Sequence, residues 1–102
     1  MAEFVTVAGV DDIEEGELRA FDVRDARIAV ANVAGAFHAF DDTCTHRQCS
    51  LAAGDLEDTT VICPCHGSEF DVTSGAVLQG PAREAVETYE TRLEEDSLEI
   101  KV

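Results

Sequence analysis

The chain has 102 residues, enough for one domain with a modest core, and carries 22 Asp and Glu against 7 Lys and Arg for a formal net charge of −15. This charge repels nucleic-acid phosphates and anionic lipid, so we expect neither nucleic acid nor a membrane as a partner, and it favours a protein partner with a basic docking patch. Solubility or adaptation to high salt explains the charge equally well, because Lys101 is the only lysine.

Short β-branched or alternating runs, separated by turn signals at roughly 8–12-residue spacing, predict an all-β sandwich or barrel. In the first part of the chain the predicted strands cover residues 4–7, 18–23, 27–33 and 36–40. A short helical turn is predicted over 10–15, where Asp11 and Asp12 could cap it.

The pattern changes after Asp42, because residues 43–59 hold few apolar side chains and sustain no helical period. Further strands are predicted over 59–62, 69–72 and 76–78, and a closing hairpin over 88–93 and 97–102. We therefore expect a single domain over 1–102. An antiparallel β base would come from residues 1–41 and 81–102, with a metal-binding subdomain, 42–80, inserted in it.

No run approaches 18 consecutive apolar residues, which a membrane-spanning helix requires. The N-terminal residues Met1 to Val5 show neither the basic region nor the apolar core of a signal peptide. These features predict a soluble, cytoplasmic protein, in which disulfides are uncommon.

Two short motifs carry the chemistry: Cys44-Thr45-His46, and Cys63-Pro64-Cys65-His66, with 16 residues between His46 and Cys63. Two thiolates and two imidazoles at this spacing indicate a metal site. A Rieske [2Fe–2S] centre needs two Cys on one iron and two His on the other, and each motif supplies one of each. The alternative is a Cys2His2 zinc site, although zinc sites usually pair Cys with Cys and His with His.

The segments 44–49 (CTHRQC) and 63–68 (CPCHGS) resemble the two cluster-binding boxes of the Rieske iron–sulfur family, and the order of the flanking strands is similar over essentially the whole chain. The resemblance implies the Rieske fold and one [2Fe–2S] cluster. Cys44 and Cys63 would bind the buried ferric iron as thiolates. His46 and His66 would bind the outer iron through ring nitrogens.

Cys49 and Cys65 lie in the same two boxes but are not implied ligands. In the respiratory branch of the family, matching cysteines form a disulfide that ties the two loops together, whereas many ferredoxins that serve oxygenases lack it. The resemblance to that branch implies a Cys49–Cys65 disulfide, which would make the cluster cradle rigid. The alternative is two buried free thiols.

The residues after the second box imply a moderate reduction potential. Ser68 matches the serine that, in the high-potential branch, bonds a bridging sulfide. Phe70 stands where that branch has a tyrosine whose hydroxyl bonds a cysteine sulfur. Hydrogen bonds to sulfur raise the potential. We therefore expect a potential below the upper end of the Rieske range, roughly −150 to +300 mV.

Four further positions complete the predicted site. Gly67 would let backbone N–H groups approach cluster sulfur. Pro81, in Gly80-Pro81-Ala82, resembles the proline loop that covers the cluster, although an ordinary turn is the alternative. Arg47 could be a docking or tuning cation, or simply pair with a neighbouring acid. We expect His38 to be structural or surface-exposed.

No nucleophile–base pair, phosphate loop or nucleotide fingerprint is present, and a Rieske iron has no open position for substrate. The resemblance implies a monomeric electron carrier that is not an enzyme. It would pass single electrons from a flavin-containing reductase to a terminal oxygenase, as in bacterial aromatic-ring-hydroxylating dioxygenase systems. The alternatives are a small Rieske-like subunit of a larger reductase, such as assimilatory nitrite reductase, and a zinc-bound structural module. A membrane-bound respiratory subunit is disfavoured by the absence of an N-terminal anchor pattern.

Overall fold

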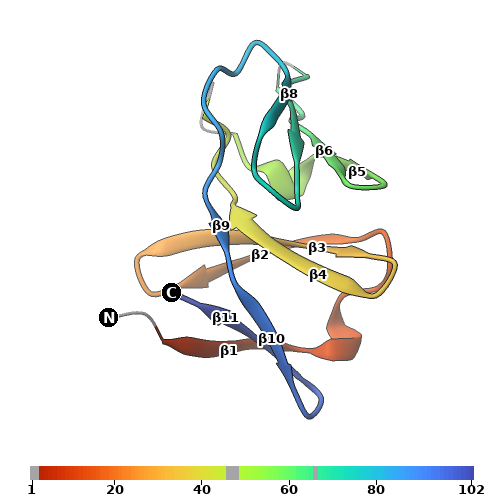
Figure 1. The fold of residues 1–102 in the computed structure, drawn as a ribbon, viewed down its shortest axis with the longest axis vertical. Coiled ribbons are helices and arrows are strands. Elements are labelled where there is room, and N and C mark those ends of the chain that lie inside the picture. The colour runs from red at the N-terminus through yellow and green to blue at the C-terminus, as the bar shows by residue number, and fades with distance from the viewer. Residues whose placement is uncertain (1–2, 46–48, 66) are drawn as a thin grey trace.

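The computed structural model describes residues 3–45, 49–65 and 67–102 (Figure 1). These residues form antiparallel strands and two single turns of 3-10 helix, so the all-β prediction is confirmed. Within the described ranges, no helix is long and apolar enough to cross a membrane. The elements are β1 (Phe4–Gly9), η1 (Val10–Asp12), β2 (Leu18–Val23), β3 (Ala26–Val33), β4 (Ala36–Asp41), η2 (Leu51–Ala53), β5 (Asp55–Glu57), β6 (Thr60–Ile62), β7 (Glu69–Asp71), β8 (Val77–Gln79), β9 (Thr88–Tyr89), β10 (Thr91–Glu94) and β11 (Ser97–Lys101).

The described strands make three antiparallel sheets, which follow one another along the long axis in Figure 1. Their strand orders are β1-β11-β10, β2-β3-β4-β9 and β5-β6-β7-β8. The third sheet is built from residues 55–79, whereas the other two combine strands from early and late parts of the chain. The chain therefore leaves the second sheet at the end of β4, builds the third sheet, and returns through β9.

Strand β3 is buried on both faces. Its successive side chains point to opposite faces of the sheet and therefore into two different cores. Ile28 and Val30 face a cluster shared with Leu98 and other residues of the lower sheets. Ala29 and Ala31 face the cluster that reaches into the third sheet. This shared cluster joins the middle sheet to the predicted metal-binding piece.

The predictions over 18–23, 27–33 and 36–40 are confirmed by β2, β3 and β4. The single strand predicted over 88–93 is wrong, because the chain changes sheets there. β9 pairs with β4 and β10 pairs with β11. An alternating pattern has the same period in either sheet, so it cannot reveal a change of partner.

Two smaller differences concern the polar segments. The polar stretch 43–59 contains η2 and β5, where Leu51 is fully buried and Leu56 pairs with Val61. The helical turn predicted over 10–15 is the shorter η1, whose N-cap is Gly9. The carboxylate of Asp12 accepts a hydrogen bond from the Gly9 N–H at 2.8 Å, instead of capping the turn at its own start.

Candidate metal centre

The first cysteine–histidine loop, residues 43–50, leaves the end of β4 and returns to η2. An isolated bridge pairs Thr43 with Ser50, and the Cys44 N–H donates to the Cys49 carbonyl at 2.8 Å. The Cys44 side chain is fully buried, and Cys49 is half-buried. The predicted ligand His46 and the predicted docking residue Arg47 lie outside the described residues.

The second cysteine–histidine loop, residues 63–68, connects β6 to β7. Its first cysteine, Cys63, is buried and donates its N–H to the Ser68 carbonyl at 2.8 Å, while its carbonyl accepts the Gly67 N–H at 3.1 Å. Gly67 has a φ of 77°, which lies in the left-handed region that favours glycine. Cys65 is exposed, and the predicted ligand His66 lies outside the described residues.

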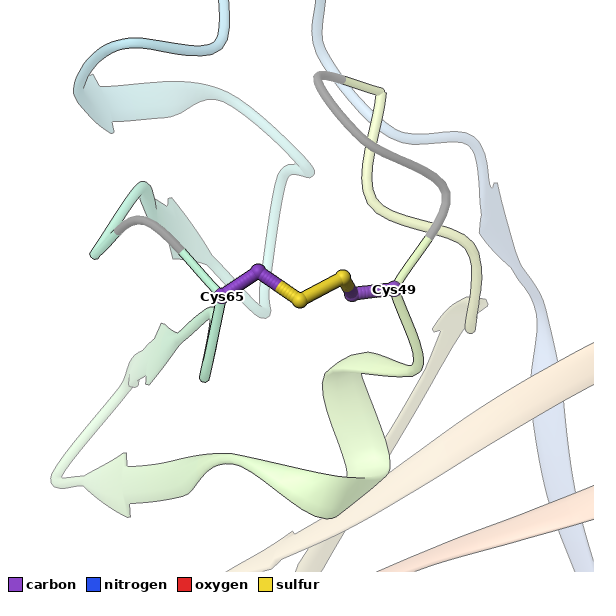
Figure 2. Close-up of a disulfide and its surroundings, with 2 residues drawn as sticks. All are labelled: Cys49 and Cys65. Atoms are coloured by element: carbon purple, nitrogen blue, oxygen red, sulfur yellow. A yellow bond between two sulfur atoms is a disulfide. The ribbon is translucent and has the colours of Figure 1, made fainter.

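A disulfide joins the two loops, from Cys49 to Cys65, across a Cα–Cα distance of 6.5 Å (Figure 2). This is the pairing that the family resemblance implied, and it lies within the usual span for disulfides. The Sγ atoms of Cys49, Cys63 and Cys65 all lie within 4.8 Å of one another. The disulfide therefore links the two loops next to the buried Cys63.

Cys44 and Cys63 are the described cysteines outside the disulfide, and both belong to the core cluster beneath the loops. Their burial keeps the two sulfurs away from bulk water, and thiolate sulfur is a soft donor suited to iron–sulfur clusters. One buried cysteine per loop matches the cysteine half of the predicted donor set. The described part of the site therefore fits an iron–sulfur group.

The segment 80–87 is hydrogen-bonded to both loops and to the structure around them. From the second loop, the Ser68 hydroxyl accepts the Ala82 N–H at 3.0 Å, and the buried Ser68 keeps its own proton to donate elsewhere. From the first loop, the Thr45 hydroxyl donates to the Glu84 carbonyl at 2.7 Å. Two backbone hydrogen bonds also hold this segment: the Val86 N–H donates to the Gly75 carbonyl, and the Asp41 N–H donates to the Glu87 carbonyl.

Pro81, the predicted cover residue, is exposed and follows a cis peptide bond from Gly80. It lines a surface hollow together with Thr45, Ala82, Arg83 and Glu84. The predicted cover residue and the first cysteine–histidine loop therefore border the same hollow.

Phe70, the predicted tuning position, is fully buried on β7 in the cluster that contains Cys44 and Cys63. Its ring packs in the core, so the described structure accounts for an aromatic residue at this position without any role in tuning. His38 lies half-buried on β4 and lines a surface hollow together with Val72 and Thr73, which follow β7.

Sequence reasoning missed the role of Asp42, a buried side chain at the start of the first loop. This carboxylate is 1 % exposed and accepts hydrogen bonds from Arg27 Nε at 3.0 Å and Ser50 Oγ at 2.7 Å. It also accepts the Ala52 N–H at 2.8 Å. The bond with Asp42, and then that with Asp22, raises the pKa of Arg27 above its already high ordinary value. No local motif signals this role, because the partners lie 8 to 15 residues away.

The comparisons with known proteins agree with this geometry. The Rieske [2Fe-2S] domain family matches residues 3–90. This chain belongs to that family. The Rieske fold predicted from the two boxes is thereby confirmed, and the iron–sulfur character of the site follows from the family.

Curated relatives of this Rieske chain are ferredoxin components of oxygenase systems. The ferredoxin component of the alkene monooxygenase system of Xanthobacter autotrophicus is 36% identical over 93 residues, which cover 90% of this chain and 75% of that protein. The 3-phenylpropionate/cinnamic acid dioxygenase ferredoxin subunit of Escherichia coli is 40% identical over 86 residues, covering 83% and 80%.

Solved structures give the same picture. The Sphingomonas yanoikuyae B1 ferredoxin superposes with a TM-score of 0.92 at 29% identity, covering 98% of this chain and 99% of that one. A chain in the complex of reduced oxygenase and oxidized ferredoxin in carbazole 1,9a-dioxygenase superposes with a TM-score of 0.91 at 30% identity, covering 95% and 91%.

Proposed function

We propose that this chain is a one-electron carrier that receives electrons from a flavin-dependent reductase and passes them to a terminal oxygenase. The observation that carries the proposal is the pair of buried cysteines, Cys44 and Cys63, at the bases of two loops joined by a disulfide. The relatives support it, because they are named as ferredoxin components and match most of both chains. The role is electron transfer and not catalysis.

We assign the ligands of one [2Fe–2S] cluster to Cys44 and Cys63 on the inner iron, and to His46 and His66 on the outer iron. When bound, such a cluster accepts and releases one electron. The chain's own residues exclude water around the two thiolates, since Cys44 and Cys63 are both buried. We further assign the substrate class of the oxygenase as aromatic compounds, which the names of several relatives support.

The residues around the ligands would set the reduction potential of the cluster and the access of partners to it. Ser68 would donate its hydroxyl proton to cluster sulfur, which favours the reduced state. Phe70 has no proton to donate, so the potential should stay below the upper end of the Rieske range. Gly67 would bring backbone N–H groups near sulfur, Pro81 would help cover the cluster, and Arg47 would contact a partner.

We also propose that residues 42–80 act as one cluster-binding unit inserted into a base formed by 1–41 and 81–102. A monomeric, cytoplasmic carrier remains our prediction. Gel filtration at several salt concentrations and cell fractionation would test it.

The first experiment measures iron, acid-labile sulfide, zinc and the visible spectrum of the purified protein. We expect two irons and two sulfides per chain. Cys44→Ser, Cys63→Ser, His46→Ala and His66→Ala should lose the iron, whereas His38→Ala, at the one histidine outside the boxes, should retain it. A colourless protein that holds one zinc and no sulfide would contradict the proposal.

The second experiment tests the direction of electron flow. The loaded protein is mixed with candidate flavoprotein reductases and then with candidate aromatic-ring oxygenases. We expect reduction by the first group and substrate turnover with the second. A chain that no reductase can reduce, and that co-purifies tightly with a large flavin or haem protein, would be a fixed subunit of a larger reductase and not a shuttle.

A further inference from the structure

The two ends of the first loop are held together by one buried side chain. The first loop begins after Asp42 and ends at Ser50, and the Asp42 carboxylate accepts hydrogen bonds from both the Ser50 hydroxyl and the Ala52 N–H. The Asp42 carbonyl also accepts the Leu51 N–H at 2.7 Å. Three hydrogen bonds therefore connect the residue before the loop to the three residues that follow Cys49.

The same carboxylate is tied to the base. It accepts Arg27 Nε at 3.0 Å, and the Asp42 N–H donates to the Arg27 carbonyl at 3.0 Å. Arg27 lies on β3, so the loop ends are fixed relative to the central strand of the molecule. A buried carboxylate is costly unless it is paired and fully hydrogen-bonded. Here a half-exposed guanidinium and two further donors meet that requirement.

The second loop needs no such side chain, because paired strands close it. β6 and β7 run antiparallel on either side of it, with Ile62 opposite Glu69. The first loop is flanked by β4 and η2, and the backbone pairing of its ends among the described residues is limited to the isolated bridge between Thr43 and Ser50. The side-chain hydrogen bonds of Asp42 hold the ends of the first loop together, as the pairing of β6 with β7 holds the ends of the second.

We propose that Asp42 is a positioning residue that fixes the first cysteine–histidine loop on the base. It thereby sets where Cys44 and Cys49 lie relative to Cys63 and Cys65. The assignment of Cys44 and Cys63 as ligands rests on the proposed function, whereas the link to the disulfide does not.

The test measures how fast a small thiol reduces the Cys49–Cys65 disulfide in the folded, cluster-free chain. Asp42→Ala removes all three side-chain bonds, so the loop should open more often and reduction should accelerate by about tenfold or more. Asp42→Asn keeps an oxygen for the Ala52 N–H and should restore part of the protection. In the loaded protein, Asp42→Ala should also broaden and shift the electron paramagnetic resonance signal of the reduced cluster.

Two controls separate positioning from general loss of stability. Asp22→Asn removes the other, exposed carboxylate on Arg27, at 3.2 Å, and should leave the reduction rate unchanged. Ile100→Val lowers the stability of the protein through the other core cluster. When variants are compared at matched unfolding free energy, it should also leave the reduction rate unchanged. A folded Asp42→Ala protein with the reduction rate and resonance signal of the parent would overturn the proposal.

If Asp42→Ala does not fold, Ser50→Ala decides the question, because it keeps the Arg27 pair and removes one bond across the loop. An increased reduction rate supports the proposal, and a parental rate overturns it. If the parent protein binds no iron or sulfide, the proposed function fails. The reduction rates of the cluster-free chain would still test the role of Asp42.

Discussion

The two loops of the candidate metal centre close with the same backbone bond but are held in place by different forces. In each, the N–H of the first cysteine donates to the carbonyl of the residue five positions later, Cys44 to Cys49 and Cys63 to Ser68. The second loop stands between paired strands over the core that contains Phe70. The first loop depends on the polar bonds of Asp42. Similar local geometry can therefore rest on strand pairing in one place and on a buried charge in another.

The largest effect should come from the core beneath the loops, which contains Phe70, Cys44 and Cys63. Phe70→Ala removes a fully buried ring, and we expect it to lower the free energy of unfolding by about 3–5 kcal/mol. Phe37→Ala, in the other core cluster, is the matched control. Denaturant unfolding should show a loss for both, but only Phe70→Ala should speed reduction of the disulfide at matched stability. Equal rates for the two variants would mean that this core does not hold the two loops in place.

The disulfide belongs to both loops, so its removal tests what they share. The closed segment spans 16 residues, for which the chain-entropy account gives a stabilisation of about 3 kcal/mol. Cys49→Ser/Cys65→Ser should be less stable than the oxidised parent by about this amount and equal to the parent under reducing conditions. Denaturant unfolding with and without reductant measures both. A difference that persists under reducing conditions would show that the serine side chains, and not the lost bond, cause the effect.

A smaller loss of stability is expected where the first loop contacts the segment 80–87. Thr45→Val removes the hydroxyl that bonds the Glu84 carbonyl and should cost about 1 kcal/mol. Thr45→Ser keeps the hydroxyl and should retain most of the stability. Hydrogen exchange of residues 80–87 should rise in the valine variant alone. Unchanged exchange there would show that the second loop fastens the segment without help from the first.

The smallest effect concerns the turn after β7. The hydrogen bonds of Thr73, first that of its hydroxyl, lower the pKa of Asp71. A lowered folded pKa stabilises the protein above the ordinary aspartate pKa of about 3.9, and this stabilisation is lost as the pH falls through the folded value. Thr73→Val should therefore be less stable than the parent at neutral pH, and the difference should shrink in acid. Unfolding curves over this pH range check it, and a constant difference would rule out Asp71 as the cause.

The sequence by itself determined the elements whose signals are local. The alternation of β3 predicts its strand, and the turn residues between β2, β3 and β4 predict the hairpins. The Cys-X-His and Cys-X2-His boxes predict the metal chemistry, because ligand type and short spacing are written in consecutive residues. The family resemblance of the same boxes supplied the pairing of Cys49 with Cys65, which composition and spacing alone left open.

Tertiary structure decided the hydrogen bonds and strand pairings whose partners lie far along the chain. The Thr45 hydroxyl meets a carbonyl 39 residues away, and Asp42 meets Arg27 15 residues back. The run 88–93 divides between two sheets because its neighbours, β4 and β11, are set by the whole topology. Hydrogen bonds and strand pairing between distant segments leave no period in the sequence, so only the folded chain reveals that Asp42 holds one loop and strand register holds the other.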